Sequence, residues 1–140
     1  MIAPRAFPFA TRFSRTSAKP LVLRQIPIWE NGIATGYVDL ASERAYVYRE
    51  HAESQIIELP KALADREKEA RFQMLEKLAD YDDDLMEQLL SDMPPPKDRV
   101  FGDLTQELRD GLIVPVLLGS AEHGNGIMRL LKALRHEAPS

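Results

Sequence analysis

The spacing of apolar residues changes at Pro60, and this change limits the possible folds more than any other feature of the sequence. Before Pro60, four short runs at 20–29, 33–40, 44–49 and 55–59 are rich in branched and aromatic residues, as β-strands are. After it, apolar residues recur every three or four positions, which is the repeat of an α-helix. Strands followed by helices predict an α+β fold, with an antiparallel sheet of about four strands covered by helices.

The helical part of the sequence divides into three predicted helices. The first begins at Lys61 and ends at Ala79, the second begins at Asp82 and ends at Ser91, and the third covers residues 98–109. Charged residues fill the positions between the apolar ones, so each helix is expected to turn one apolar side towards the sheet.

Two groups of charged residues on these helices have a structural explanation. Glu67 and Arg71 are four positions apart and predict an ion pair on the helix surface. Asp80 and residues 82–84 stand where the second helix begins, which suits the positive end of a helix dipole. A calcium loop would need a central glycine that is absent here, so a solvated helix start is the preferred interpretation.

The end of the chain predicts a strand at 112–118, a glycine-rich turn and an amphipathic helix at 126–137. Many nucleotide sites begin with this order of elements. Gly119 and Gly124 have the separation found in a phosphate-binding P-loop, but an Asn-Gly pair occupies the next two positions, where Lys and Ser or Thr are required. The turn is therefore not a P-loop. The apolar residues of the helix share one side: Ile127, Leu130, Leu131 and Leu134.

The sequence contains no complete catalytic or metal site. A dinucleotide fingerprint fails because Arg129 stands in place of its third glycine, and Ser120 with His123 lacks the glycine pattern of a hydrolase nucleophile. No cysteine is present, and the three histidines have no metal-ligand spacing: His51, His123 and His136. A binding or interaction module is the function that the residues alone indicate.

Charge is distributed unevenly along the chain. Residues 1–29 contain five basic and no acidic side chains, whereas the remainder contains 13 basic and 22 acidic ones. An acidic body is unsuited to nucleic-acid phosphates, so no direct sequence-specific nucleic-acid binding is expected. No apolar run approaches the roughly 20 residues of a membrane helix. The absence of cysteine fits a reducing compartment, and a cytoplasmic protein is predicted.

The Gly-Ser-Ala segment of the turn permits a more specific comparison. The run I-V-P-V-L-L-G-S-A-E-H-G-N-G-I-M-R-L-L-K-A-L resembles the last guanine-recognition motif of translational GTPases, and among them elongation factor G. Upstream, P-L-V-L-R-Q-I-P-I, G-Y-V-D-L, R-A-Y-V-Y and Y-D-D-D-L-M-E-Q-L-L are similar to the insertion that distinguishes elongation factor G from its relatives. The resemblance covers about residues 19–139, in the family's order.

The resemblance implies a division of the chain into three parts. Residues 1–18 match the family poorly and are expected to form a leader without fixed structure, an organelle transit peptide being the alternative. Residues 19–111 correspond to the inserted G-prime subdomain, and residues 112–140 to the last strand, loop and helix of a GTPase domain of the P-loop type. One segment is implied to contact the guanine base through backbone N–H groups: Gly119, Ser120 and Ala121. Glu122 departs from the apolar or basic residue that usually follows Ser-Ala.

The family's phosphate-binding, switch and N-K-x-D motifs would lie before residue 1. GTP and Mg²⁺ are therefore expected in a parent protein, and neither is expected to bind tightly to this chain, which has no predicted catalytic residue. The expected partners are the ribosome and its stalk protein, through the helix that begins at Lys61 and the helix that begins at Asp82. Two alternatives remain open: a stand-alone protein-interaction module without nucleotide binding, and part of a divergent ribosome-protection or recycling GTPase.

Overall fold

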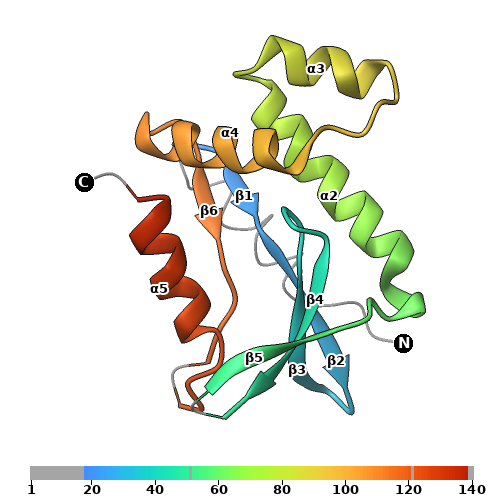
Figure 1. Cartoon of the computed structure of the whole chain (residues 1–140), viewed down its shortest axis with the longest axis vertical. Helices are drawn as coiled ribbons and strands as arrows, with labels where there is room; N and C mark the ends of the chain where they lie inside the picture. Colours follow the sequence, from blue (N-terminus) through green and yellow to red (C-terminus); the bar gives the residue numbers. More distant parts are fainter. Residues whose placement is uncertain (1–17, 51, 121, 139–140) are drawn as a thin grey trace.

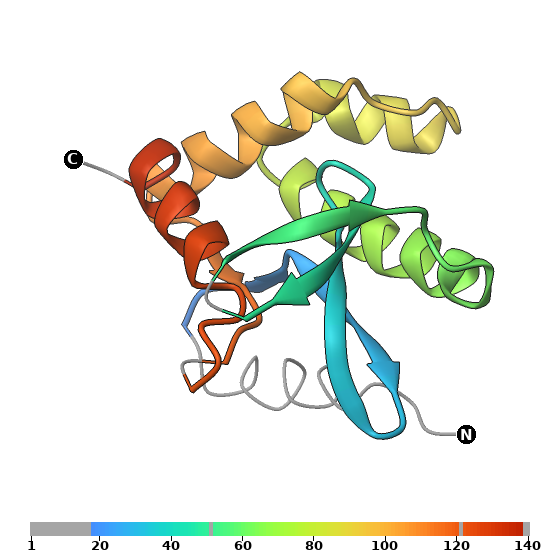
Figure 2. The same ribbon diagram turned by 60° about the horizontal axis from the view of Figure 1, so that its bottom comes forward.

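The computed structural model describes residues 18–50, 52–120 and 122–138, and it confirms the predicted α+β class (Figure 1). The helices α2 and α5 lie on different sides of the main sheet, and α4 crosses one end of it (Figures 1 and 2). In chain order the elements are β1 (Leu21–Leu23), β2 (Gln25–Glu30), β3 (Ile33–Asp39), β4 (Arg44–Arg49), β5 (Ala52–Ile57), the 3₁₀ turn η1 (Lys61–Leu63), α2 (Ala64–Ala79), α3 (Asp83–Leu90), α4 (Lys97–Arg109), β6 (Val114–Val116) and α5 (Ile127–His136).

The main sheet is antiparallel, with strand order β2-β3-β4-β5, so each strand pairs with its neighbour in the sequence. The runs at 33–40 and 44–49, predicted as strands, form an antiparallel hairpin with Tyr37 opposite Tyr46. Successive side chains of a strand point to opposite faces, so Val38 and Tyr37 serve different sides of the sheet. Val38 is fully buried in the core, whereas the ring of Tyr37 stacks on that of Tyr46 with 5.0 Å between centroids. The second face is therefore aromatic, with Tyr37 against both Tyr46 and Tyr48.

The single strand predicted at 20–29 is wrong, because this segment forms two strands in different sheets. β1 pairs in parallel with β6, with Leu21 opposite Val114, while β2 begins the antiparallel sheet. Arg24 separates the two strands and is only 2% exposed. Its Nη1 atom donates to both carboxylate oxygens of Glu137, at 3.1 and 3.2 Å. This partner is 113 positions away, so no local pattern could indicate the break.

Two other predicted strands have different bounds. β5 covers Ala52–Ile57 rather than 55–59, and most of its residues are exposed, because it is an edge strand and needs no buried face. β6 covers Val114–Val116 rather than 112–118, and Val114 is 39% exposed instead of buried. β1 and β6 belong to different parts of the predicted three-part division, and the small parallel sheet joins those parts.

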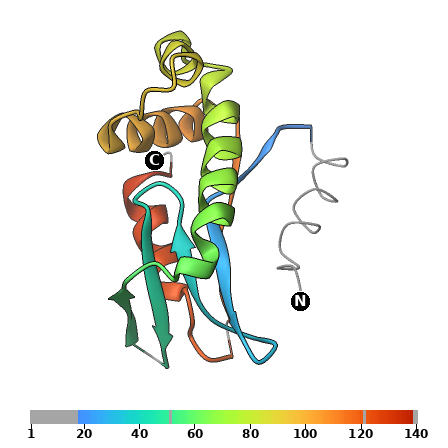
Figure 3. The ribbon, with the colours of Figure 1, turned by 90° about the vertical axis from the view of Figure 1, so that its right-hand side faces the viewer.

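The apolar core lies between the main sheet, α2, α3 and α4. The three predicted helices are confirmed to within a few residues, except that the first begins as a 3₁₀ turn. Figure 3 shows α2 running along the sheet, with α3 folded back over its end. Fully or almost fully buried apolar residues come from every one of these elements: Val22, Ile26, Val38, Met74, Leu78, Leu85, Val100 and Leu104.

Glu67 and Arg71, predicted as an ion pair on the helix surface, are instead buried at 6% and 8% exposure, and Arg71 pairs with Glu43 while Glu67 Oε1 has no hydrogen-bond partner among the described residues. Arg71 Nη1 donates to the carbonyl oxygens of Leu40 and Ala41, the latter at 3.1 Å, and its Nε lies 3.2 Å from a carboxylate oxygen of Glu43. The long side chain therefore fixes the turn between β3 and β4 to α2. Helical spacing could not predict this, because it places residues on a helix face without saying which face meets a loop.

The predicted apolar side of α5 is largely exposed. Leu130, Leu131 and Leu134 are 39%, 52% and 55% exposed, and Ala133 is the buried residue of this fully described helix. Within the described ranges, no helix combines the length and the apolar character that crossing a membrane requires.

Candidate functional site

The turn between β6 and α5 contains the segment that the sequence assigns to a guanine base. The N–H of Ser120 donates to the carbonyl of Asn125 at 2.8 Å, and the N–H of Asn125 donates back to the carbonyl of Ser120 at 3.0 Å. The Ser120 N–H is therefore already used inside the turn. Gly119 is exposed, and Ala121 lies outside the described residues. Contact of a base with this segment stays a prediction.

Glycine is required at three positions of this turn. Gly124 and Gly126 have φ angles of 71° and 78°, in the left-handed region that other residues rarely adopt. A Cβ at Gly126 would lie 2.5 Å from the carbonyl oxygen of Leu118, and a Cβ at Gly119 would lie 2.8 Å from that of Asn125. These glycines let the two sides of the turn approach closely before α5 begins, as the sequence predicts for Gly124 and Gly126.

The chemistry of the turn is neutral to acidic. Its described side chains include exposed Glu122 and His123, and residues 111–128 contain no lysine or arginine. A phosphate group would therefore meet no cation belonging to the turn itself, although Gly124 and Gly126 line a cavity that Arg129 and Lys132 also line. What the turn can offer is backbone polarity, which suits the edge of a neutral base better than a charged phosphate.

A partly apolar groove of about 390 Å³ separates α2 from α3. These are the two helices that the resemblance assigns to a ribosomal partner. Phe72 and Leu90 line the groove and are 49% and 81% exposed, which is unusual for large apolar side chains beside one another. Lys77 also lines it and donates to the carbonyl of Leu21 at 2.6 Å, which ties α2 to β1. The α2 wall of the groove is thus fixed to the strand β1.

The acids stand at the start of α3, as the sequence predicts, but Asp82 caps the helix and is paired with Arg99 rather than solvated. Asp82 accepts hydrogen bonds from the N–H groups of Asp84 and Leu85, at 3.1 and 3.2 Å. The guanidinium of Arg99 in α4 donates to both carboxylate oxygens of Asp82, at 2.8 and 3.0 Å. These hydrogen bonds hold the pKa of Asp82 well below its usual range. The oxygens of Asp82 are thereby committed to joining α3 to α4.

Two further acids of α4 lie beneath this cap and have the opposite shift. Burial, with the nearby Asp82 second, raises the pKa of Asp103 to about 7. Burial, with the nearby Asp103 second, raises the pKa of Glu107 to about 8. Glu107 is 4% exposed, and its Oε1 atom has no hydrogen-bond partner among the described residues. Sequence reasoning missed Asp103 and Glu107, because helical periodicity alone does not distinguish these acids from other charged residues of the helix.

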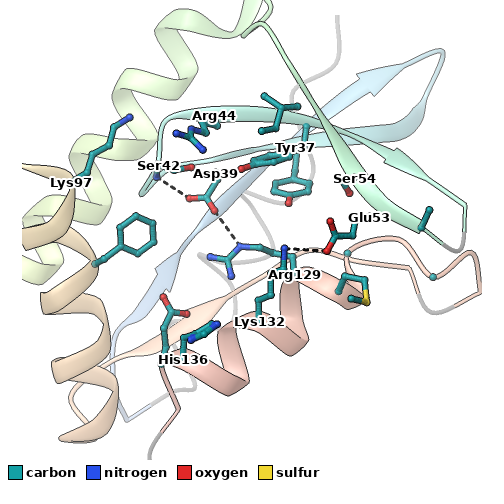
Figure 4. A pocket seen from close by; sticks show the side chains of 18 of the residues that line it. Tyr37, Asp39, Ser42, Arg44, Glu53, Ser54, Lys97, Arg129, Lys132 and His136 are labelled. Atoms are coloured by element: carbon teal, nitrogen blue, oxygen red, sulfur yellow. Dashed lines mark hydrogen bonds and ion pairs between the residues drawn. The ribbon is translucent and has the colours of Figure 1, made fainter.

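A second and larger cavity, of about 660 Å³, lies between the aromatic face of the sheet and the helices α4 and α5. Asp39 stands at its centre and accepts from the N–H groups of Ala41 and Ser42 and from Nε of Arg129, at 2.9, 3.1 and 3.4 Å (Figure 4). At its rim, Lys132 lies 3.2 Å from Glu53. Its lining contains one histidine, His136, and seven charged residues: Asp39, Arg44, Glu53, Lys97, Arg129, Lys132 and Glu137.

Sequence reasoning missed this cavity as well. Its residues come from five elements between β3 and α5, and no short motif joins them. Three residues of its lining have a place in the sequence argument, each for another reason: Gly124 in the test for a P-loop, Arg129 in the test for a dinucleotide fingerprint, and His136 in the search for metal ligands. His136 lines the cavity and His123 does not, while His51 lies outside the described residues. The described residues contain no cluster of three or more metal-ligating side chains.

Comparison with known proteins identifies relatives for most of the chain. The sequence is 46% identical over 123 residues to an elongation factor G-like protein of Synechocystis, covering 88% of this chain and 18% of that protein. It is 32% identical to elongation factor G of Rhodopirellula baltica, over 94% of this chain and 21% of that protein. Elongation factor G of Fervidobacterium nodosum is also 32% identical, over 93% of this chain and 19% of that protein. The chain thus spans about a fifth of the length of the curated relatives it matches.

The fold has a counterpart among solved structures. A crystal structure of a protein from Thermus thermophilus superposes with a TM-score of 0.78 and 25% sequence identity, covering 96% of this chain and 20% of that one. No family model matches the sequence. In both the sequence and the structure comparisons, the chain therefore corresponds to about a fifth of a longer protein.

Proposed function

Because the chain belongs to the elongation factor G family over most of its length, we propose that it is the ribosome-facing segment of a cytoplasmic translational GTPase. The parent protein would use GTP hydrolysis, with Mg²⁺, to drive movement on the ribosome or its recycling. This segment would contribute a protein-binding surface and one side of the guanine site. Neither the phosphates nor the catalytic groups of the reaction would be held here.

The groove between α2 and α3 is the observation that carries the proposal. Its exposed Phe72 and Leu90 lie on the two helices that the family resemblance assigns to the ribosomal stalk. An exposed apolar groove between two helices suits an amphipathic helix of a partner protein. The acidic residues beside it, Glu76 and Asp80, suit a partner with basic residues around its apolar contact.

The C-terminal unit supports the same proposal from another direction. The leucines of α5 are exposed, and the β1–β6 sheet has only two strands among the described residues. Parallel sheets are normally covered on both faces, and two strands are too few for an independent sheet. Since a family member is about five times longer than this chain, we infer that its GTPase core covers α5 and extends this sheet.

The stalk interaction is tested by NMR titration of the 140-residue chain with the C-terminal domain of the stalk protein. Shifts should be confined to α2 and α3 and their loop. The double variant Phe72→Ser with Leu90→Ser should weaken binding by at least about fivefold, as loss of interface anchors does. The control, Ile33→Ser with Leu131→Ser, removes two similarly exposed apolar side chains elsewhere and should leave affinity unchanged. Shifts elsewhere, or none at about millimolar concentration, would contradict the proposal.

Nucleotide binding has a separate test. Calorimetry with GTP and Mg²⁺ should give no sub-micromolar affinity, because the turn supplies no cation and no P-loop is present in the sequence. Tight binding would favour a complete nucleotide site within this chain. A chain that binds the stalk but shows no guanine contact in any longer form would instead favour the stand-alone interaction module.

A further inference from the structure

The cavity between the aromatic face of the sheet and the helices α4 and α5 has a charge opposite to that of the chain. The whole protein carries a formal charge of −4. Within the cavity lining, however, four side chains are cationic: Arg44, Lys97, Arg129 and Lys132. Three are anionic, namely Asp39, Glu53 and Glu137. The lining thus carries one more cation than anions, and a concave site with an excess of positive charge attracts anions even when the net charge of the protein opposes them.

Each carboxylate of this cavity is already matched by a cation. Asp39 accepts from Arg129 and from two backbone N–H groups. Glu53 pairs with Lys132, and both oxygens of Glu137 accept from Arg24, which does not belong to the lining. The negative charge is therefore neutralised within the walls.

Two cations of the lining remain without such a partner. Among the described residues, neither Arg44 nor Lys97 forms a salt bridge, and both are exposed. Figure 4 shows them at the same end of the cavity, with Glu53 towards the other end. Arg44 is anchored in β4 and Lys97 in the first turn of α4. An anion entering at this end would meet two charges supplied by separate elements.

The remaining walls suit an organic molecule. Phe101 and Tyr46 contribute aromatic surface, and Ile56 contributes aliphatic surface. The volume of about 660 Å³ is within the range of small-molecule sites, which are mostly apolar with a few placed polar groups. We propose that this cavity binds a small organic anion with phosphate or carboxylate groups, held by Arg44 and Lys97 while its uncharged part lies against Phe101 and Tyr46. Arg favours phosphate and carboxylate oxygens because it can donate two parallel hydrogen bonds.

The probes for this site are ADP and inorganic pyrophosphate, added to ¹⁵N-labelled full chain at about physiological ionic strength, where surface attraction is screened. ADP is used because the proposed guanine contact of the Gly119 turn does not predict adenine binding. Both probes should give saturable shifts at β4 and at the start of α4, and ADP should bind more tightly because its ring adds apolar contact.

Charge reversal provides the decisive comparison. Arg44→Glu with Lys97→Glu should raise the dissociation constant for ADP by at least about tenfold. The control, Lys61→Glu with Lys68→Glu, makes the same change of net charge on exposed residues outside the lining, and should change it by less than about threefold. Arg44→Gln with Lys97→Gln removes the charges without adding new ones, and keeps the test valid should the reversed variant fold poorly.

Several results would overturn the proposal. These are an absence of saturable shifts up to about 10 mM of either probe, equal effects of the two charge-reversed variants, or no effect of the glutamine variant. Shifts confined to Gly119 and Ser120, which do not belong to the lining, would place the ligand elsewhere. Tighter cavity binding of a Glu-rich peptide than of either probe would show that the site serves a protein segment rather than a small molecule.

Discussion

The helices α2 and α5 lie on different sides of the sheet and are attached to it by different interactions. α2 buries Ala70, Met74, Leu75, Leu78 and Ala79 in the common core. In α5, which is described in full, the buried residue is Ala133, and the leucines point to solvent. Its links to the rest of the fold are ion pairs: Arg129 with Asp39, Lys132 with Glu53, and Glu137 at its C-terminal cap with Arg24.

This difference indicates on which side of the sheet the apolar surface is covered within the chain. Burial of apolar surface is the main source of stability. Of the three ion pairs of α5, only Lys132 with Glu53 is exposed, and an exposed pair contributes little. The apolar face of α2 is therefore already buried within this chain. α5 is positioned by polar contacts on one side and leaves its apolar side available, which is the arrangement expected of a helix that packs against further protein.

The largest expected effect concerns the apolar core between the main sheet, α2, α3 and α4. Leu78→Ala should lower the free energy of unfolding by about 3 kcal/mol, because Leu78 is fully buried and its loss leaves a cavity. Urea denaturation followed by circular dichroism measures this. Hydrogen exchange should show that protection falls throughout the sheet, α2, α3 and α4. A loss of unfolding free energy below about 1 kcal/mol would mean that burial in this core is not the main source of the chain's stability.

The second effect concerns the buried ion pair of α5. Glu137→Gln keeps the shape of the side chain but leaves Arg24 buried with its charge unmatched, which should cost about 2 kcal/mol. Exchange should increase mainly in α5 and at β1, while α2 keeps its protection. Glu53→Gln is the control, because its pair with Lys132 is largely exposed and should contribute less than about 0.5 kcal/mol. Equal effects of the two variants would contradict a special role for the buried pair.

How much of this could be predicted from sequence differs between the two sides. The core side follows periodicity: the strands β3 and β4 and the helices α2 to α4 were predicted within a few residues. The C-terminal side depends on partners far apart in the chain. The apparent strand at 20–29 divides because β1 pairs with β6 and β2 with β3, and Arg24 between them pairs with the distant Glu137. Periodicity predicted an apolar face for α5 without showing that this face has no partner among the described residues.

The candidate sites follow the same division. The glycines of the turn and the acids at the start of α3 have local signals, and both were predicted. The sheet–helix cavity combines residues of β3, β4, β5, α4 and α5, so its charge pattern exists only in the folded chain. Local sequence also could not distinguish Glu107, whose buried Oε1 lacks a hydrogen-bond partner among the described residues, from exposed acids on the same helix.

The third prediction concerns Glu107 of α4, whose ionisation should make the free energy of unfolding depend on pH. Its pKa is raised from 4.5 to about 8 in the folded chain, chiefly by burial. Below about pH 4.5 the carboxyl is protonated in both states, and above about pH 8 it is ionised in both, so stability is lost as pH rises through this window. Glu107→Gln cannot ionise. It should therefore be more stable than the original chain by about 1 to 2 kcal/mol at pH 9 and similar at pH 5.

Unfolding curves at the two pH values measure this difference. Glu87→Gln, on the exposed surface of α3, is the matched control and should give no pH-dependent change. The direction of the change in stability is informative, because it is opposite for Glu107→Gln and Glu137→Gln. Removing an acid from α5 should weaken the attachment of that helix, whereas removing Glu107 should relieve the core side of a charge that burial disfavours. A destabilised Glu107→Gln at pH 9 would show that this carboxylate is compensated in solution.

The smallest expected effect is the most direct test of the exposed side. Leu131→Gln with Leu134→Gln should change the free energy of unfolding of this chain by less than about 0.5 kcal/mol, because both leucines are already more than half exposed. Sedimentation should show less self-association than the original chain, since an exposed apolar face favours contact between copies. A loss near that of Leu78→Ala would mean that α5 is buried in solution, and the contrast between the two helices would fail. In a family member of full length the same pair should destabilise by about 2 kcal/mol or more, because there the proposed GTPase core would bury both side chains.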